Sequence, residues 1–140
     1  MSIEYLFVYG TLRRQGGSSW HDFLAQHCQY AGDASFQGRL YMLQGYPGLV
    51  GSAHSQDQVI GELYRLPVCK GAGAVEAVLN ALDEYEECST QFPRPHEYLR
   101  QVHPVLLADK QHLKAWVYIY NRRTDETARI VSGDFLKRDS

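Results

Sequence analysis

One short stretch near the start of the chain is apolar on both of its alternating faces. It consists of Tyr5, Leu6, Phe7, Val8 and Tyr9. This run predicts a strand buried on both sides. Gly10 and Thr11 follow directly, and a glycine there lets a ligand approach the main chain, whose N–H groups can bind an anion. An ordinary turn between strand and loop has the same residues, so this stretch by itself leaves both interpretations open.

A second pattern, in the middle of the chain, has the spacing of an amphipathic helix. Its apolar positions recur every three or four residues and predict a helix over about residues 74–86. They are Val75, Val78, Leu79, Leu82 and Tyr85. An acidic cluster of Asp83, Glu84, Glu86 and Glu87 falls at the end of this helix, where the helix dipole is negative.

Within this cluster, Glu86 falls on the apolar side of the helix. At about 100° per residue, Glu86 lies near the centre of the stripe, whereas Glu84 faces solvent on the opposite side. Desolvation, acidic neighbours and the helix dipole would raise the pKa of a carboxyl group placed there, which could then exchange a proton near neutral pH. Alternatively, the helix ends before Glu86 and the cluster is a solvated helix terminus.

Most of the remaining pattern predicts strands. A short helix, which Ser18 or Ser19 could cap, is predicted over residues 20–27. The predicted strands are residues 29–43, with glycine interruptions at 32 and 38, residues 58–66, and a hairpin over residues 98–107 and 112–121.

Two short segments predict turns. In Tyr46, Pro47 and Gly48, the proline fixes φ and the glycine can take the left-handed position. Near the C-terminus, residues 132–135 predict a turn that Phe135 would anchor.

Length and composition narrow the class of protein. A chain of 140 residues is about one domain long, and we expect a single domain over residues 1–140. The net charge of −2 supplies no basic surface for nucleic acid or an anionic membrane. No apolar run approaches the roughly 18 residues of a membrane span, and no signal-peptide pattern is present, so we expect a cytoplasmic protein. We expect a small-molecule partner and a monomer or weak dimer.

Motifs for metals and for activated nucleophiles are weak. The cysteines at positions 28, 69 and 88 form no Cys-x-x-Cys pair, and the histidines lack ligand spacing. We therefore expect no metal and no cofactor. Ser52 and His54 are close in sequence, but no Gly-x-Ser-x-Gly motif supports a serine hydrolase.

Two motifs, taken together, resemble those of the γ-glutamylcyclotransferase-like superfamily. They are Val8-Tyr9-Gly10-Thr11-Leu12-Arg13 and Leu82-Asp83-Glu84-Tyr85-Glu86. Further short matches lie at residues 46–48, 61–64, 97–100 and 117–122. The resemblance therefore covers most of the chain, which is similar both to short bacterial members and to γ-glutamylamine cyclotransferases.

The resemblance implies a fold and a reaction. The fold is α+β, a small twisted mixed β-barrel flanked by helices, with both motifs at one cavity. In the reaction, the α-amine of a γ-glutamyl group attacks its own γ-carbonyl and releases 5-oxoproline with a free amine or amino acid. Backbone N–H groups of Gly10, Thr11 and Leu12 would hold the substrate's α-carboxylate or the developing oxyanion. Glu86 would act as general acid/base. The other candidates for substrate binding are Tyr9, Tyr98 and Tyr120.

The chain departs from the family's pattern in two places. Many members have glycine directly after the motif glutamate, whereas here Glu87 follows Glu86. The segment over residues 88–96 is long and contains Pro93 and Pro95. We expect it to act as a lid or to limit the size of the substrate.

Two other functions stay open at this point. A non-catalytic module could use the same cavity to bind a small carboxylate or the terminus of a partner chain. A small hydrolase could use the same carboxylate to activate water and would release glutamate in place of 5-oxoproline. In Glu86→Gln, the cyclotransferase should lose turnover and keep ligand affinity, whereas a binding module should show no turnover before mutation.

Overall fold

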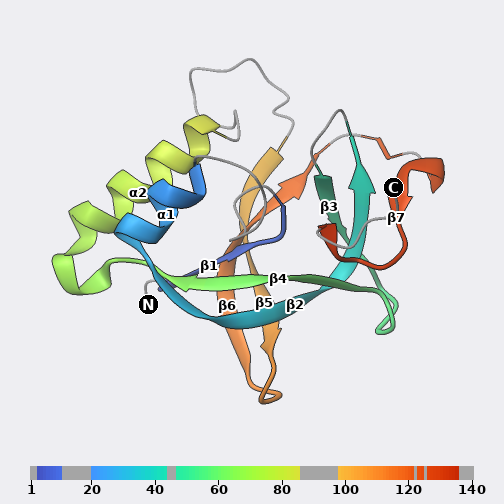
Figure 1. Ribbon diagram of the computed structural model, residues 1–140, viewed down its shortest axis with the longest axis horizontal. Helices are drawn as coiled ribbons and strands as arrows, with labels where there is room; N and C mark the ends of the chain where they lie inside the picture. The colour runs from blue at the N-terminus through green and yellow to red at the C-terminus, as the bar shows by residue number, and fades with distance from the viewer. Residues whose placement is uncertain are drawn as a thin grey trace.

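The structure, a computed structural model, describes residues 3–10, 20–43, 47–85, 98–121, 123–124 and 126–135. Five of its strands close into a barrel, and two helices lie together on one side of that barrel (Figure 1). The barrel strands are β1 (Tyr5–Val8), β2 (Gln29–Met42), β4 (Gln58–Arg65), β5 (Tyr98–Leu107) and β6 (His112–Tyr120). The α+β fold, a mixed β-barrel flanked by helices, is confirmed.

The barrel closes because β2 pairs at both ends of the strand order. The order runs β2-β4-β1-β6-β5, and β2 then pairs with β5. Within this barrel β1 and β6 pair in parallel, with Leu6 beside Trp116, while the other pairings are antiparallel. Since β1 and β6 run in the same direction, the segments that follow them leave from the same end of the barrel.

Strand β1 is buried on both faces, as its sequence predicts. Leu6 and Val8 pack outward with residues of the helices, whereas Phe7 and Tyr9 point into the barrel. None of these four side chains is more than 7% exposed. The strand is therefore a shared wall between the barrel interior and the helical layer.

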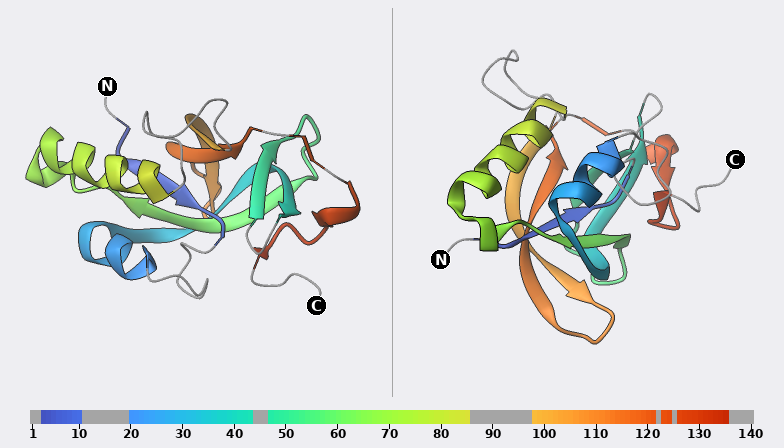
Figure 2. Two further views of the ribbon diagram at one scale, coloured as in Figure 1. Left: turned by 90° about the horizontal axis from the view of Figure 1, so that it is seen from above. Right: turned by 60° about the vertical axis from the view of Figure 1, so that its left-hand side comes forward.

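The two helices lie side by side on the outer face of the barrel (Figure 2). They are α1 (Trp20–His27) and α2 (Ala72–Tyr85), the latter following a 3-10 turn, η1 (Val68–Lys70). Leu24 of α1 is buried against β1 together with Val78, Leu79 and Leu82 of the predicted apolar stripe of α2, and Val75 is partly buried beside them. Both predicted helices are confirmed, although α2 begins two residues earlier than expected.

Strand β2 continues past the barrel and forms a second region. It pairs with β4 as far as Gln37 and with β3 (Pro47–Gly51) from Gly38 onward. This extension also pairs with β7 (Arg129–Ile130), which follows the 3-10 turn η2 (Glu126–Ala128), and lies away from the helices (Figure 1). The two predicted glycine interruptions thus correspond to a bulge near Gly32 and a change of partner at Gly38, within one strand.

The predicted turn at residues 46–48 is wrong for the two residues that the structure describes. Pro47 and Gly48 begin strand β3, opposite Met42 and Tyr41 of β2. Proline is tolerated there because β3 is an edge strand and Pro47 is its first residue. Tyr46 lies outside the described residues.

The other strand predictions agree with the structure. The hairpin of β5 and β6 is confirmed, with paired residues from Tyr98 opposite Tyr120 to Leu106 opposite His112. The predicted C-terminal turn is also present, and Phe135 is buried in the same cluster as the barrel interior.

Candidate active site

One end of the barrel gathers the described residues that the sequence analysis assigned to substrate binding. Strand β1 leads into Tyr9 and Gly10, β5 begins at Tyr98, and β6 ends at Tyr120. Tyr98 and Tyr120 are opposite each other in the β5–β6 ladder, and their rings meet edge to face with centroids 5.7 Å apart. The parallel pairing of β1 and β6 carries Gly10 toward this same end.

The start of β3 joins these three strands. A Cβ atom added to Gly10 would lie 2.5 Å from Cγ of Pro47, and one added to Gly48 would lie 2.9 Å from Cγ of Tyr120. The hydroxyl of Tyr98 donates a hydrogen bond to the carbonyl of Pro47, at 2.7 Å. Both glycines are therefore required for close packing, and Pro47 and Gly48 belong to the framework of the site. In the sequence, residues 46–48 matched the family's pattern but were predicted only to form a turn.

Two of the candidate tyrosines hold the main chain with their hydroxyls. The buried hydroxyl of Tyr9 donates to the backbone carbonyl of Tyr118 at 2.6 Å, as that of Tyr98 does to Pro47. The exposed fractions of Tyr9 and Tyr98 are 7% and 5%, whereas Tyr120 is half-buried. Tyr120 is thus the most accessible of the three rings.

The remaining predicted site residues lie outside the described part of the chain. These are Thr11, Leu12, Glu86 and the segment over residues 88–96. Helix α2 is described up to Tyr85, directly before Glu86.

Asp83, three residues before Glu86, is bound to the β5–β6 hairpin. Arg100 of β5 donates to both of its oxygens, from Nε to Oδ1 at 2.8 Å and from Nη2 to Oδ2 at 3.1 Å. The hydroxyl of Tyr118 donates to Oδ1 at 2.7 Å. In the sequence Asp83 could be recognised only as a negative neighbour of Glu86, because the arginine that compensates its charge is 17 positions away.

Glu62, which the motif resemblance covered without assigning it a role, is a buried carboxylate near the end of β1. Its side chain is 3% exposed, it lies opposite Val8 in the β1–β4 ladder, and Tyr64 donates a hydrogen bond to it at 3.1 Å. An acid within a strand of mostly apolar residues was the signal available in the sequence. Glu62 is a second candidate for proton transfer at this end of the barrel.

The structure does not support the Ser52–His54 pair as a hydrolase site. The hydroxyl of Ser52 donates to Asp57 at 2.7 Å and accepts from the backbone N–H of His54 at 3.1 Å. The Ser52 hydroxyl therefore connects Asp57 to the main chain of His54, and neither of these two hydrogen bonds involves the imidazole ring of His54. Over the described ranges, no three His, Cys, Asp or Glu side chains are grouped so that they could hold a metal ion.

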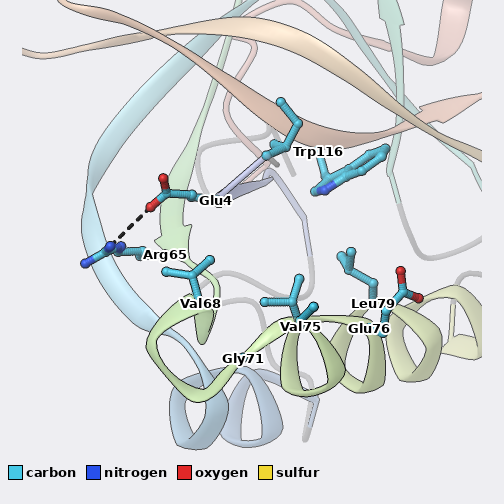
Figure 3. Close-up of a pocket in the computed structure, with 10 residues that line it drawn as sticks. Glu4, Arg65, Val68, Gly71, Val75, Glu76, Leu79 and Trp116 are labelled. Carbon is cyan, nitrogen blue, oxygen red and sulfur yellow. Dashed lines mark hydrogen bonds and ion pairs between the residues drawn. The ribbon is translucent and has the colours of Figure 1, made fainter. Parts of the chain in front are cut away.

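A separate pocket of about 750 Å³ lies near the other end of β1, between helix α2 and Trp116 of β6 (Figure 3). At its edge Arg65 pairs with Glu4 at 3.1 Å, and Val75 and Leu79 form its apolar wall. Glu4 and Gly10 are six residues apart along an extended chain, or roughly 20 Å. This pocket is therefore distinct from the end of the barrel that gathers the candidate site residues.

Comparisons with known proteins agree with the fold and with the motifs. The sequence model of the family described as gamma-glutamyl cyclotransferase, AIG2-like, matches residues 6–137. The Gamma-glutamylcyclotransferase family protein YtfP of Escherichia coli K12 is 37% identical over 139 residues, which cover 96% of this chain and 97% of that protein. The bovine Gamma-glutamylaminecyclotransferase is 28% identical over 123 residues, 81% of this chain and 63% of that protein. Among solved structures, a mouse AIG2-like protein has a TM-score of 0.66 at 21% identity, over 90% of this chain and 82% of the other, and this likeness shows the fold.

Proposed function

This chain belongs to the gamma-glutamyl cyclotransferase, AIG2-like family, and from that premise we propose that it converts a small γ-glutamyl conjugate into 5-oxoproline and a free amine or amino acid. At the level of the family, the names of its relatives support γ-glutamyl cyclotransferase-like activity. The particular substrate and the roles of individual residues are our proposal.

The proposed reaction is an internal displacement. The α-nitrogen of the γ-glutamyl group forms a bond to the γ-carbon, and the bond from that carbon to the leaving nitrogen breaks. Glu86 takes the proton that the α-amine loses and delivers it to the leaving nitrogen. Because the nucleophile is part of the substrate, the protein accelerates the reaction chiefly by holding a ring-closing conformer.

The observation that carries this proposal is the convergence of chain segments at one end of the barrel. Gly10 and Tyr120 are brought there by parallel strands, and Asp83 is bound there by Arg100. In our proposal, the backbone N–H groups from Gly10 to Leu12 hold the substrate's α-carboxylate or the oxyanion. In the same proposal Tyr120 contacts the substrate, while Tyr9 and Tyr98 hold the main chain of the site in place through their hydrogen bonds to Tyr118 and Pro47.

The names of the relatives guide the choice of leaving group. The bovine relative is named a γ-glutamylamine enzyme, but it is less similar to this chain than the bacterial relatives, whose names specify no leaving group. We propose a γ-glutamyl amine as the first substrate to test, followed by γ-glutamyl amino acids and glutathione.

The test is a mass-spectrometric assay for 5-oxoproline with that panel of substrates. We expect Glu86→Gln to lower kcat by about 100-fold or more with little change in ligand affinity. Glu84→Gln is the matched control, because it removes a neighbouring charge that the helical pattern directs to the opposite side. If Glu62→Gln abolishes turnover and Glu86→Gln does not, the acid/base role belongs to Glu62.

Two other outcomes would replace the proposal with one of its alternatives. Release of glutamate would indicate a hydrolase. Binding of the substrates without any product would indicate a non-catalytic binding module.

Location and assembly belong to the proposal as well. None of the helices that the structure describes is long and apolar enough to cross a membrane. Cys28 and Cys69 are free thiols, and burial raises the pKa of the Cys28 thiol to about 12. We propose a monomer or weak dimer in the cytoplasm, which light scattering and cell fractionation would test.

A further inference from the structure

Tyr118 of strand β6 contacts both segments on which the proposed function depends. Its backbone carbonyl accepts the hydroxyl of Tyr9, which directly precedes Gly10. Its own hydroxyl donates to Asp83, which is three residues before Glu86 in the sequence. Tyr118 is 3% exposed, its hydrogen bond with Tyr9 is buried, and its hydrogen bond with Asp83 is part-buried. The two motifs, more than 70 residues apart in the sequence, therefore meet at one buried tyrosine.

Arg100 restricts Asp83 in a second direction. Its Nε and Nη2 atoms donate hydrogen bonds to the two carboxylate oxygens of Asp83. Its guanidinium carbon lies over the ring of Trp116, 4.4 Å from the ring centroid. A two-point contact between a planar guanidinium and a carboxylate determines orientation as well as distance. The side chains of Arg100 and Asp83 are only 21% and 14% exposed, so competition from water is limited.

The end of helix α2 needs such a restraint. The last turn of this helix contains no basic residue, and its sequence there is acidic, which is unfavourable at the negative end of the helix dipole. Arg100 supplies from β5 the positive charge that the helix itself lacks. The apolar side chain of Leu82 holds this turn against the barrel, and the polar contacts of Asp83 add a defined orientation.

We propose that Tyr118, Asp83 and Arg100 form a positioning clamp, which sets the C-terminal turn of α2, and so the start of the segment that carries Glu86, relative to Gly10. The inference rests on the proposed function. A proton-transferring group must lie within hydrogen-bond reach of its target, and a displacement of about 1 Å can lower a rate about 100-fold. The three residues act through Glu86 and do not themselves transfer the proton.

The most selective variant is Tyr118→Phe. It removes one hydroxyl, and it keeps the ring and the carbonyl that binds Tyr9. We expect kcat for 5-oxoproline release to fall about 10- to 100-fold with KM changed less than about threefold. We also expect faster hydrogen exchange of the backbone amides over residues 79–85, because the last turn of α2 loses a restraint.

The matched control is Tyr41→Phe. The hydroxyl of Tyr41 also donates to a carboxylate, that of Glu126 at 2.7 Å, but in the extension of β2 away from α2. This variant should lower Tm to a similar extent and leave both kcat and the exchange of residues 79–85 unchanged. A second comparison uses Arg100→Gln and Arg100→Lys, of which only the lysine variant should restore part of kcat.

The outcomes separate this inference from the proposed function. If the unmodified protein releases no 5-oxoproline, the proposed function fails, and the exchange measurements alone decide whether Tyr118 restrains α2. If Tyr118→Phe and Tyr41→Phe affect Tm alike and neither alters exchange over residues 79–85, the clamp does not exist. If exchange rises in Tyr118→Phe but kcat does not fall in an active enzyme, the clamp exists and has no role in positioning for catalysis, which overturns the proposal.

Discussion

Two aspartates in this protein, Asp83 and Asp57, are held by the same chemistry in different regions. Each is little exposed, with side-chain fractions of 14% for Asp83 and 9% for Asp57. Each carboxylate pairs with arginine and accepts a hydrogen bond from a hydroxyl. For Asp83 the partners are Arg100 and Tyr118, which connect a helix to the barrel.

The partners of Asp57 connect strands instead. Arg39 of β2 lies 2.8 Å from Oδ2, Arg129 of β7 lies 3.0 Å from Oδ1, and Ser52 after β3 donates to Oδ2 at 2.7 Å. This cluster joins the extension of β2 to the loop before β4 and to the C-terminal segment.

The difference lies in what each cluster holds in place. The Asp57 cluster secures strands to one another, where the backbone ladders already set the register, and it should contribute mainly stability. The Asp83 cluster secures the end of a helix, where no ladder sets the position, and it lies at the end of the barrel that gathers the candidate site. The same contacts can therefore serve stability in one region and alignment in the other.

The largest effect on stability should come from Asp57→Asn. This change removes the charged carboxylate that Arg39 and Arg129 share and leaves Arg39 its 3.8 Å contact with the exposed Glu126. We expect Tm to fall by roughly 5–10 °C. Turnover should stay within about twofold of the unmodified protein, because distant sites act independently. Circular dichroism and the 5-oxoproline assay measure both quantities. A large loss of kcat below the unfolding temperature would contradict the division between the two clusters.

The stability contributed by Asp57 should also depend on pH. The Ser52 hydroxyl and the Arg39 guanidinium hold the pKa of Asp57 well below its usual value. A carboxyl group with a depressed folded-state pKa stabilises the protein above its unfolded-state pKa, near 4, and loses that contribution as pH falls through the folded-state pKa. Urea unfolding should therefore show a gap between the unmodified protein and Asp57→Asn that is full at neutral pH and narrows below about pH 4. A gap that does not vary with pH would indicate that charge is not its cause.

A smaller effect is expected for the direct coupling of Asp83 with Arg100. In a double-mutant cycle of Asp83→Asn and Arg100→Gln, the free energies of unfolding should deviate from additivity by about 1–2 kcal/mol. Urea unfolding of the four proteins measures the coupling. If the effects of Asp83→Asn and Arg100→Gln on the free energy of unfolding are additive, the contact between these two residues contributes no stability. Only the kinetic test with Tyr118→Phe would then remain for the Asp83 cluster.

The smallest effect should come from the ion pair of Glu4 and Arg65. The two side chains are 46% and 48% exposed, so solvent screens their attraction, and Glu4→Gln should change the free energy of unfolding by less than about 0.5 kcal/mol. The same urea measurement sets the baseline for the other two clusters. If Glu4→Gln lowered the free energy of unfolding as much as Asp57→Asn does, burial would not explain why ion pairs in this protein differ in their contribution to stability.

The elements that sequence predicted well are those with a strong local period. Strand β1 and the apolar stripe of α2 could be recognised because alternation and helical spacing are properties of neighbouring residues. Four of the seven predicted site residues are described, and the structure brings Tyr9, Gly10, Tyr98 and Tyr120 to one end of the barrel, while their roles stay predictions.

The features that the sequence did not predict all depend on contacts between residues that are far apart in the chain. Pro47 and Gly48 were predicted to form a turn because those residue types favour turns locally, yet pairing with β2 makes them a strand. Arg100 and Tyr118 were not connected to Asp83, because neither lies near it in the chain. Glu62 lay in a family match but was given no role, because its burial depends on the neighbouring strands.

The sequence by itself determined the two helices and the long strands, which of their faces are apolar, and which family the motifs resemble, because each of these depends on residue types at short spacing. Only the tertiary structure decided that β2 closes the barrel and then continues with β3 and β7, and that Tyr118 contacts Tyr9 and Asp83 at once. Such contacts join residues far apart in the chain, and their geometry arises only when the whole barrel has closed.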